Sequence, residues 1–377
     1  MPLEFKKNNI PFTLGVEMEI QILDAESLQL KPIAPEILHR LQCDKLTKEM
    51  FRSTAELITS VCNNVHDVAV DLEKSIIKVE SLRNELNLEF SGTGTNPTAN
   101  YRERLLTASP RYHELMDRNQ WLIQRMAVYG LHIHIGMPDG DACIRFNNFF
   151  LQLVPHLIAI SASSPFWQGH NTGLAACRPT VYEAHPTAGM PQLFSNWQQF
   201  SDRYDELIQT KAIQSMKDIW WDMRPSPNFG TLELRICDGP ASLSELLAIV
   251  AFVHALTLWF EENESFFNKQ NPEIPQRWIL RENKWRAIRY GLDAEFINHR
   301  SLRTFPMKSQ IQKWMTMVKP YYDKLGYDQY FDTLEQIVIR GNSSERQRKV
   351  FEESGSLIPV LELNANEFRE RKPIWTS

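Results

Sequence analysis

The sequence of 377 residues contains neither of the two common glycine-rich loops that bind nucleotide phosphates. No G-x-x-x-x-G-K-[ST] segment occurs, and no G-x-G-x-x-G segment opens a helix after a strand. The G-x-S-x-G nucleophile elbow is also missing. If the protein binds a nucleotide, we therefore expect metal ions and arginines, not a phosphate loop, to hold its phosphates.

Cysteine is scarce and scattered, with five residues and no C-x-x-C pair. This pattern argues against a closed zinc site built on paired cysteines and favours reduced thiols in a cytoplasmic protein. Residues 1–7 lack the apolar core of a secretory signal. The longest apolar run, residues 246–260, contains His254 and is expected to be too short to span a bilayer.

Runs of lysine and arginine are also lacking, and the net charge is −5. We therefore expect neither nucleic acid nor a membrane to be a main partner. The hydrophobic fraction of 43% and the charged fraction of 23% are typical of a soluble globular protein. The length is sufficient for one large domain or two.

Three short segments alternate charged and aliphatic residues in the same way. They are residues 14–20, 131–136 and 231–236. Neighbouring side chains on a strand point to opposite faces, so residues two apart share a face. The charged pairs that this places together are Glu17 with Glu19, His132 with His134, and Glu233 with Arg235. The alternation predicts a sheet with one aliphatic face and one face of carboxylates, imidazoles and a guanidinium.

Carboxylate oxygens are ligands for Mg²⁺, imidazole also suits Mn²⁺ or Zn²⁺, and a planar guanidinium fits phosphate. Each pair also has a simpler interpretation. Glu17 and Glu19 can be solvated carboxylates, the two histidines can be core residues or a surface pair, and Glu233 with Arg235 can be an ion pair. The repetition of the pattern in three segments favours a metal and phosphate site, to which Arg224 in a proline-rich segment adds a second guanidinium.

The remaining periodicity predicts a mixture of strands and helices. Strands are expected at residues 12–22, 55–62 and 86–91, and helices at 66–86, 111–129, 140–162, 197–209, 242–262 and over most of 281–371. Strands flank and interrupt the helices, which favours an α+β fold with a mainly antiparallel sheet. Residues 164–191 are rich in proline and glycine and are expected to form a lid or binding loop.

Four longer segments, residues 13–19, 130–136, 163–169 and 220–235, resemble a known family, and residues 285–292 extend the match. The most specific of them reads W-W-D-M-R-P-S-P-N-F-G-T-L-E-L-R. In these segments the chain resembles the type 2 glutamate–cysteine ligase family, whose bacterial members include the YbdK-like carboxylate-amine ligases. The resemblance extends over nearly the whole chain, in order.

The resemblance implies a glutamine-synthetase-like fold, with a curved, mainly antiparallel sheet and helices on its outer face. It implies one catalytic domain over residues 1–377, mostly helical from about residue 281. It also implies ATP and either Mg²⁺ or Mn²⁺ as cofactors. The implied metal ligands are Glu17, Glu19, Glu56, His132 and Glu233. Arg235 and Glu233 would be catalytic, Arg235 and Arg224 would contact the nucleotide, and Thr95, Asn96 and Arg178 would lie on the substrate side.

The implied reaction is ATP-dependent joining of the γ-carboxylate of glutamate to an amine, cysteine in the reference reaction, through an acyl phosphate. One alternative is a ligase of the same fold that joins another carboxylate and amine. The other is a non-catalytic relative that binds a nucleotide or metabolite. The family also suggests a homo-oligomer, most simply a dimer.

Three positions depart from the family pattern. Arg52 replaces an acidic residue four positions before Glu56, Asn96 replaces a histidine in the glycine-rich loop, and Asn171 replaces an aspartate. Loss of the acidic residue is expected to thin the ligand shell of one metal ion. The two asparagines bear on the choice of amino-acid substrate.

Overall fold

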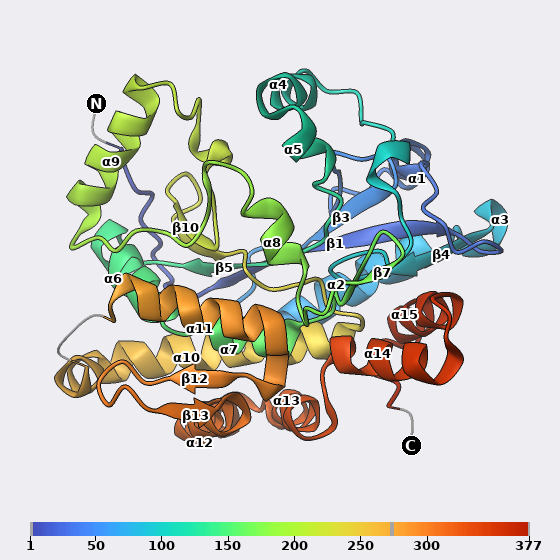
Figure 1. The fold of residues 1–377 in the computed structure, drawn as a ribbon. Helices are drawn as coiled ribbons and strands as arrows, with labels where there is room; N and C mark the ends of the chain where they lie inside the picture. The colour runs from blue at the N-terminus through green and yellow to red at the C-terminus, as the bar shows by residue number, and fades with distance from the viewer. Residues whose placement is uncertain (1–2, 272–274, 376–377) are drawn as a thin grey trace.

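A seven-stranded sheet organises the protein in the computed structural model, which describes residues 3–271 and 275–375 (Figure 1). Its order is β10-β11-β5-β1-β3-β2, with β4 also paired to β1, and every pairing is antiparallel. The strands are β1 (Leu14–Asp24), β2 (Leu46–Lys48), β3 (Thr54–Ile58), β4 (Leu88–Ser91), β5 (Leu131–Gly136), β10 (Met223–Ser226) and β11 (Thr231–Leu234).

The strand register places the charged residues of different strands opposite one another. Glu17 of β1 faces His132 of β5, and Glu233 of β11 faces His134. On the other side of β1, Glu19 faces Glu56 of β3. Residues directly opposite in an antiparallel pair have side chains on the same face. One face of the sheet is therefore polar along its whole width.

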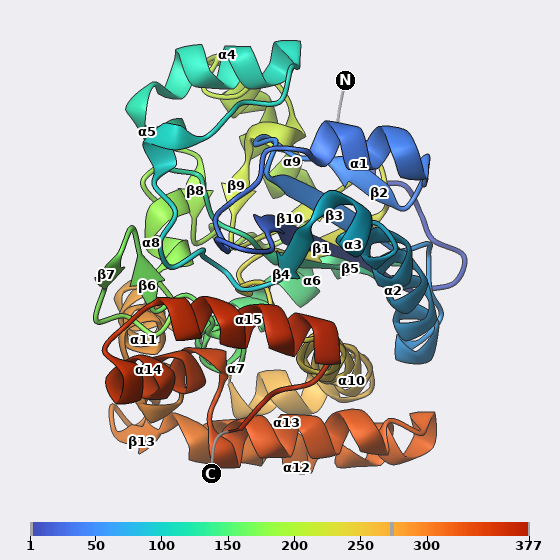
Figure 2. The same cartoon turned by 90° about the vertical axis from the view of Figure 1, so that its right-hand side faces the viewer.

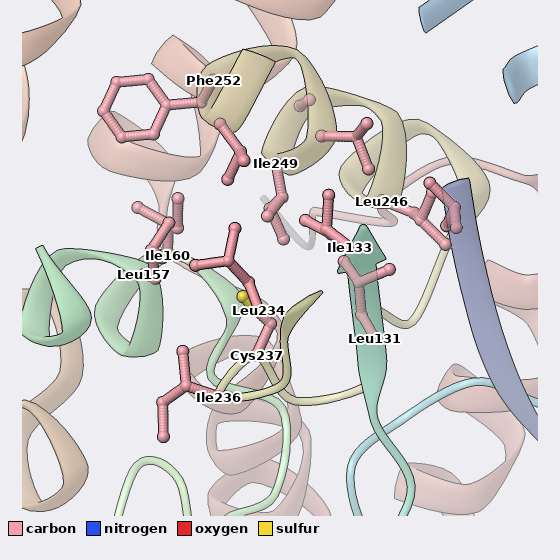
Figure 3. Packing of buried hydrophobic residues seen from close by; sticks show 14 of the residues in the cluster. Leu131, Ile133, Leu157, Ile160, Leu234, Ile236, Cys237, Leu246, Ile249 and Phe252 are labelled. Atoms are coloured by element: carbon pink, nitrogen blue, oxygen red, sulfur yellow. The ribbon is translucent and has the colours of Figure 1, made fainter. Parts of the chain in front are cut away.

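The opposite face of the sheet is aliphatic and packs against helices. Val16, Met18, Ile133, Leu232 and Leu234 are each at most 1% exposed. Figure 3 shows Ile133 and Leu131 of β5 directed towards Leu246 and Ile249 of the long helix α10 (Leu243–Gln270). Alternation of charged and aliphatic residues thus separates a polar face from an aliphatic one, as the sequence predicts.

Helices surround this sheet on both sides. Before the last two strands of the main sheet come α1 (Ala34–Leu41), α2 (Val65–Glu80), α3 (Arg83–Leu86), α4 (Pro110–Asn119), α5 (Trp121–Gln124), α6 (Gly140–Leu151), α7 (Val154–Ser161), α8 (Arg178–Tyr182) and α9 (Trp197–Gln209). After α10 come α11 (Arg277–Tyr290), α12 (Met307–Leu325), α13 (Asp328–Arg340), α14 (Ser343–Ser354) and α15 (Ile358–Glu370). In Figure 2, α12 to α15 lie below the sheet, whereas α4 and α5 lie above it.

Short elements complete the fold. They are the strands β6 (Phe166–Trp167), β7 (His170–Asn171), β8 (Ala188–Gly189), β9 (Trp220–Trp221), β12 (Glu295–Ile297) and β13 (Thr304–Pro306), and the 3₁₀ helices η1 (Tyr101–Glu103), η2 (Met216–Asp218) and η3 (Gly291–Asp293). The first three of these strands and α8 occupy residues 164–191, where the composition predicted a lid or binding loop. The α+β class with a mainly antiparallel sheet is confirmed.

Two predicted helices are interrupted. The helix expected over residues 111–129 ends at Asn119, because Gln120 adopts a positive φ of 48° and the chain restarts as the one-turn α5. The helix expected over 140–162 is divided into α6 and α7, which are bent by 63°. Pro155 lies in the first turn of α7, a position that proline favours and that starts a new helix.

Helix α10 is longer than the apolar run from which it was predicted. Its 28 residues are sufficient in length and apolar character to cross a membrane, so the argument that this segment is too short was wrong. However, 89% of its most apolar window is buried inside the protein. The helix has the character of a core helix, and its apolar surface is used by the sheet and by α12 and α13.

Candidate active site

The polar face of the sheet forms one wall of a cleft with a volume of about 580 Å³. Other walls come from α4, from β9 and from the turn between β10 and β11. The structure brings most of the predicted site residues into this cleft. Those that line it are Glu17, Glu19, Glu56, His132, Arg178, Arg224, Glu233 and Arg235.

One group of potential metal ligands lies between β1, β5 and β11. Ligand atoms of Glu17, His132 and Glu233 all lie within 4.8 Å of one another. Glu17 is held by both histidines of β5: His132 Nδ1 lies 3.0 Å from Glu17 Oε2, and His134 Nε2 lies 3.2 Å from Oε1. Carboxylates from two strands therefore converge on one imidazole, a ligand set that suits Mn²⁺ and is accepted by Mg²⁺.

A second group lies beside the first and shares His132 with it. Here ligand atoms of Glu19, Glu56 and His132 are within 4.8 Å of one another. Glu19 Oε2 accepts a hydrogen bond from the Gly130 amide at 2.6 Å, and Glu56 Oε2 accepts one from Thr47 Oγ1 at 2.9 Å. His132 Nε2 is buried and has no hydrogen-bond partner among the described residues. An unpartnered buried imidazole nitrogen beside two carboxylates fits a metal ligand.

The charges in the two groups are balanced differently. Burial raises the pKa of Glu17 and Glu233, but both pKa values fall below the usual range because hydrogen bonds and charges of neighbouring groups outweigh it. For Glu17 these neighbours are His132 and His134, and for Glu233 they are Arg224 and Arg235. Both carboxylates are therefore ionised in the folded protein.

Glu56 and Glu49 have the opposite balance. Burial raises the pKa of Glu49 to about 8, and the nearby charge of Glu19 adds to the shift. Burial also raises the pKa of Glu56 well above its usual value, with further contributions from Glu49 and Glu17. Carboxylates packed together in this way favour protonation unless a cation joins them. A divalent cation is therefore chemically matched to this side of the cleft.

Glu49 was missed by the sequence analysis. It follows the short strand β2, two residues after Thr47, and only the fold brings it to the cleft. The alternation of Thr47 and Glu49 was the one available signal, over too few residues to be distinctive. Arg52, which replaces an acidic residue of the family pattern, does not line the cleft. Glu49 supplies an additional carboxylate on that side.

Two arginines surround Glu233 from opposite sides. Arg224 Nε donates to Glu233 Oε2 at 2.7 Å, and Arg224 Nη2 donates to Oε1 at 3.3 Å. Arg224 Nη1 donates to the carbonyl oxygens of Met216 and Ile219 at 3.2 and 2.8 Å. Arg235 Nη1 donates to Glu233 Oε1 as well. The Arg224 guanidinium is occupied by protein acceptors, whereas Arg235 has one carboxylate partner and faces the cleft.

Arg178 lines the cleft, but much of its guanidinium is bound to backbone. Its Nη1 lies within hydrogen-bonding distance of three carbonyl oxygens, those of Arg235, Ile236 and Cys237, at 3.1, 3.4 and 3.0 Å. The side chain is 5% exposed and its Cζ atom lies 5.2 Å from the centre of the Tyr182 ring. Arg178 therefore braces the chain directly after β11, in addition to any contact that it makes with a ligand.

Thr95 and Asn96 are buried and do not line the cleft. Thr95 Oγ1 donates to the carbonyl oxygen of Phe166 at 2.8 Å, and Asn96 Oδ1 accepts from the Ala99 amide at 2.9 Å. Both side chains fix the loop in which they lie. Asn171, on the exposed strand β7, also lies outside the cleft lining. The structure instead adds Arg104 and Arg111 to the lining, from segments that show no strand periodicity.

Comparison with known families identifies the chain. The model of glutamate-cysteine ligase family 2 matches residues 13–362. The chain belongs to this family. A family member from Bdellovibrio bacteriovorus, provisionally named glutamate–cysteine ligase 2, is 41% identical over 364 residues, 96% of this chain and 95% of the relative. A protein of the same provisional name from Gloeobacter violaceus is 38% identical over 368 residues, 96% of this chain and 98% of the relative.

Solved structures of ligases share the fold of this family member. A glutamate–cysteine ligase from Francisella tularensis, solved in complex with AMP, has a TM-score of 0.70 and 12% identity over 99% of this chain and 91% of its own. A bifunctional glutathione synthetase from Pasteurella multocida has a TM-score of 0.70 and 14% identity over 96% of this chain. The chain spans about half the length of the Pasteurella protein, 52%. At these identities, the similarity to the two solved structures shows a shared fold.

Proposed function

We propose that the protein is an ATP-dependent carboxylate–amine ligase that joins the γ-carboxylate of glutamate to an amine, with cysteine as the first candidate. The observation that carries this proposal is the pair of carboxylate–imidazole groups that share His132 on the wall of one cleft. Arg235 lies beside them, 3.5 Å from His132 Nδ1. Membership of glutamate-cysteine ligase family 2 and the names of the Bdellovibrio and Gloeobacter relatives support the choice of substrates.

In the proposed reaction, an oxygen of the substrate carboxylate attacks the γ-phosphorus of ATP, and ADP leaves. The unprotonated amine nitrogen then attacks the carbonyl carbon of the acyl phosphate, inorganic phosphate leaves, and the nitrogen loses a proton to the departing phosphate or to water as the amide bond forms. Phosphoryl transfer of this kind depends mainly on positioning and charge neutralisation, so no protein nucleophile is required. The absence of a nucleophile elbow from the sequence agrees with this chemistry.

The residues of the cleft have separate roles in the proposal. Glu17 and Glu233 would hold one Mg²⁺ or Mn²⁺ ion with His132, and Glu19 and Glu56 would hold another on the other side of this imidazole. Bound divalent ions neutralise phosphate charge and orient the phosphates. Arg235, whose guanidinium faces the cleft, stabilises the negative charge of the transferred phosphoryl group.

The proposal treats the chain as one catalytic domain. Its C-terminal helices pack on the elements that support the sheet: α11 contacts α7, and α12 and α13 contact α10. Buried residues of these helices belong to the same hydrophobic cluster as Val16 and Ile133 of the sheet. The helical part from about residue 281 is therefore a support for the site rather than a separate unit.

A single assay tests the activity. ADP release from Mg-ATP is measured with glutamate alone, with glutamate and cysteine, and with other amino acids and amines, and products are identified by mass. We expect slow release with glutamate that cysteine or another amine stimulates. Glu233→Gln should abolish release, whereas Glu362→Gln, an exposed carboxylate on α15, should not alter it. If no carboxylate and amine pair raises ADP release above background, the protein is not a ligase.

A further inference from the structure

Phe229 is the most exposed aromatic residue in the cleft lining. Its side chain is 66% exposed, and it occupies the turn between β10 and β11 at one end of the cleft. A single exposed aromatic residue on a protein surface needs no special explanation. Phe229 differs because it belongs to the lining of the cleft that holds the carboxylates and guanidinium groups of the predicted site.

The turn that carries Phe229 is firmly held. Within the turn, the amides of Phe229 and Gly230 donate to the Ser226 carbonyl oxygen at 3.1 and 2.9 Å. The N-terminal segment fixes it from outside: the Lys6 amide donates to the Pro227 carbonyl oxygen at 3.0 Å, and Asn8 Nδ2 donates to the Gly230 carbonyl oxygen at 2.5 Å.

Gly230 is required for this arrangement. Its φ is +70°, and a Cβ atom placed there would lie 2.2 Å from the Lys6 carbonyl oxygen. A larger residue at position 230 would therefore force the backbone near Lys6 to move, and the exposed ring of Phe229 is held by a turn that needs glycine there.

The imidazole of His134 lies between the Phe229 ring and Glu17, one of the candidate metal ligands. The centre of the Phe229 ring is 6.1 Å from that of His134, at an interplanar angle of 86°, and His134 Nε2 lies 3.2 Å from Glu17 Oε1. His134 is the one ring that contacts Phe229 among the described residues. The face of Phe229 is therefore open beside a site whose charges suit phosphates.

Most other aromatic rings of the cleft lining are buried or contact another ring, and Tyr112 is half-buried. Trp220 packs edge-on against His185 at 4.9 Å, and Trp221 stacks with Phe194 at 6.1 Å. At the opposite end, near Arg178, Tyr129 and Tyr182 are 1% and 6% exposed. Phe229 is therefore the most exposed ring of the lining and offers a face to a planar ligand.

We propose that Phe229 is the stacking platform for the adenine base of ATP, which places the nucleotide at the end of the cleft formed by the β10–β11 turn. This inference rests on the proposed ligase function. Base stacking on an aromatic side chain is lost on alanine substitution and requires an open ring face. With the base on Phe229, the phosphates extend past His134 towards Glu17 and Arg235, and the end near Arg178 is left for the amino acid.

The test compares two ligands that differ in the base. Binding of the magnesium complexes of a non-hydrolysable ATP analogue and of inorganic tripolyphosphate is measured by calorimetry. Phe229→Ala should raise the Kd of the ATP analogue at least fivefold and leave the Kd of tripolyphosphate unchanged. Phe229→Trp should retain analogue binding, and Phe229→Leu, which keeps the apolar bulk without a π face, should lose part of it.

Phe266→Ala removes another exposed ring, 55% exposed, from α10 outside the cleft lining, and should change neither Kd. An unchanged Kd for the ATP analogue in Phe229→Ala would overturn the stacking role. Equal weakening of both ligands would also overturn it, because the ring would then act through the turn and not on the base. If the wild-type protein binds neither ligand, the proposed ATP-dependent ligase function is wrong as well as the stacking role. The ADP-release assay tests that function independently.

Discussion

Arg235 and Glu233, two residues apart at the end of β11, form an ion pair on the wall of the cleft. Glu233 is 1% exposed and also pairs with Arg224, so two guanidinium groups share one carboxylate. The pair is compatible with two roles. Arg235 either stabilises the reacting phosphoryl group or only braces the strand, and the two roles predict different effects of one substitution.

Arg235→Lys retains the charge and removes the planar fork that suits a phosphate. If Arg235 acts on the phosphoryl group, turnover should fall at least about tenfold, which corresponds to about 1.4 kcal/mol of transition-state stabilisation. The melting temperature should change little, because Arg224 still pairs with Glu233. ADP release and thermal unfolding are measured on the same preparation. A lower melting temperature with a near-normal rate would assign Arg235 to bracing.

Divalent cations should stabilise the folded protein, because burial and neighbouring carboxylates raise the pKa of Glu49 and of Glu56. Saturating Mn²⁺ should raise the melting temperature by roughly 2 °C or more. Glu56→Gln should raise it in the absence of metal, since one buried carboxylate is removed, and should reduce the shift caused by Mn²⁺. The exposed Glu362→Gln should respond to Mn²⁺ as the wild type does. A metal shift that persists in full in Glu56→Gln would exclude Glu56 as a ligand.

Lys284 and Asp222 form a buried pair behind the cleft. Lys284 Nζ lies 2.7 and 2.6 Å from the two oxygens of Asp222, which is fully buried, and Tyr182 donates to the same carboxylate at 2.8 Å. Lys284→Met should lower the free energy of unfolding by about 3–5 kcal/mol, because Asp222 keeps a buried charge with no cation. Denaturant unfolding measures the loss.

The matched control for this pair is Lys308, which pairs with Asp293 at 3.1 Å where the two side chains are 37% and 74% exposed. Lys308→Met should change the free energy of unfolding by less than about 1 kcal/mol. Equal losses of unfolding free energy in Lys284→Met and Lys308→Met would show that burying the Asp222 pair does not increase the cost of removing its cation.

Asp238 should make stability depend on pH. Burial raises its pKa from 3.8 to about 6. Between these values the folded protein binds more protons than the unfolded chain, so the free energy of unfolding falls as pH rises, by up to about 3 kcal/mol from this group. Asp238→Asn should flatten this part of the profile, because an amide oxygen can still accept from Ser163 and Ser164. The free energy of unfolding of the wild type and of Asp238→Asn is measured by denaturation at pH 4 and at pH 7. An equal change between the two pH values in both proteins would contradict the prediction.

Strand periodicity was sufficient to predict the two faces of the sheet. Because side chains alternate with a period of two, Glu17 and Glu19 had to share a face if residues 14–20 formed a strand. Val16 and Met18 then had to occupy the buried face, as they do. The same rule applied to β5 and β11. Of the lining residues that the sequence analysis missed, Glu49 and Arg104 lie outside any strand or helix longer than three residues, where no period fixes the direction of a side chain.

Helix boundaries were less predictable for a related reason. The helical spacing of apolar residues continues across a bend when the helices on both sides of it bury an apolar face. For this reason α6 and α7 were expected as one helix. The glycine-rich loop was also ambiguous, because exposed and buried loops have similar compositions. Thr95 and Asn96 were expected on the substrate side, but the structure places both side chains in the loop interior, and their proposed contact with substrate stays a prediction.

The sequence by itself determined which residues are polar, which strand faces they occupy and which family the chain resembles. Only the tertiary structure decided that β1 lies between β5 and β3, and thereby that Glu17 meets Glu233 while Glu19 meets Glu56. It also decided that an exposed Phe229 stands beside His134 at one end of the cleft. The physical reason is that alternation is a local property of each strand, whereas strand order and register depend on how helices such as α10 cover the aliphatic face as a whole.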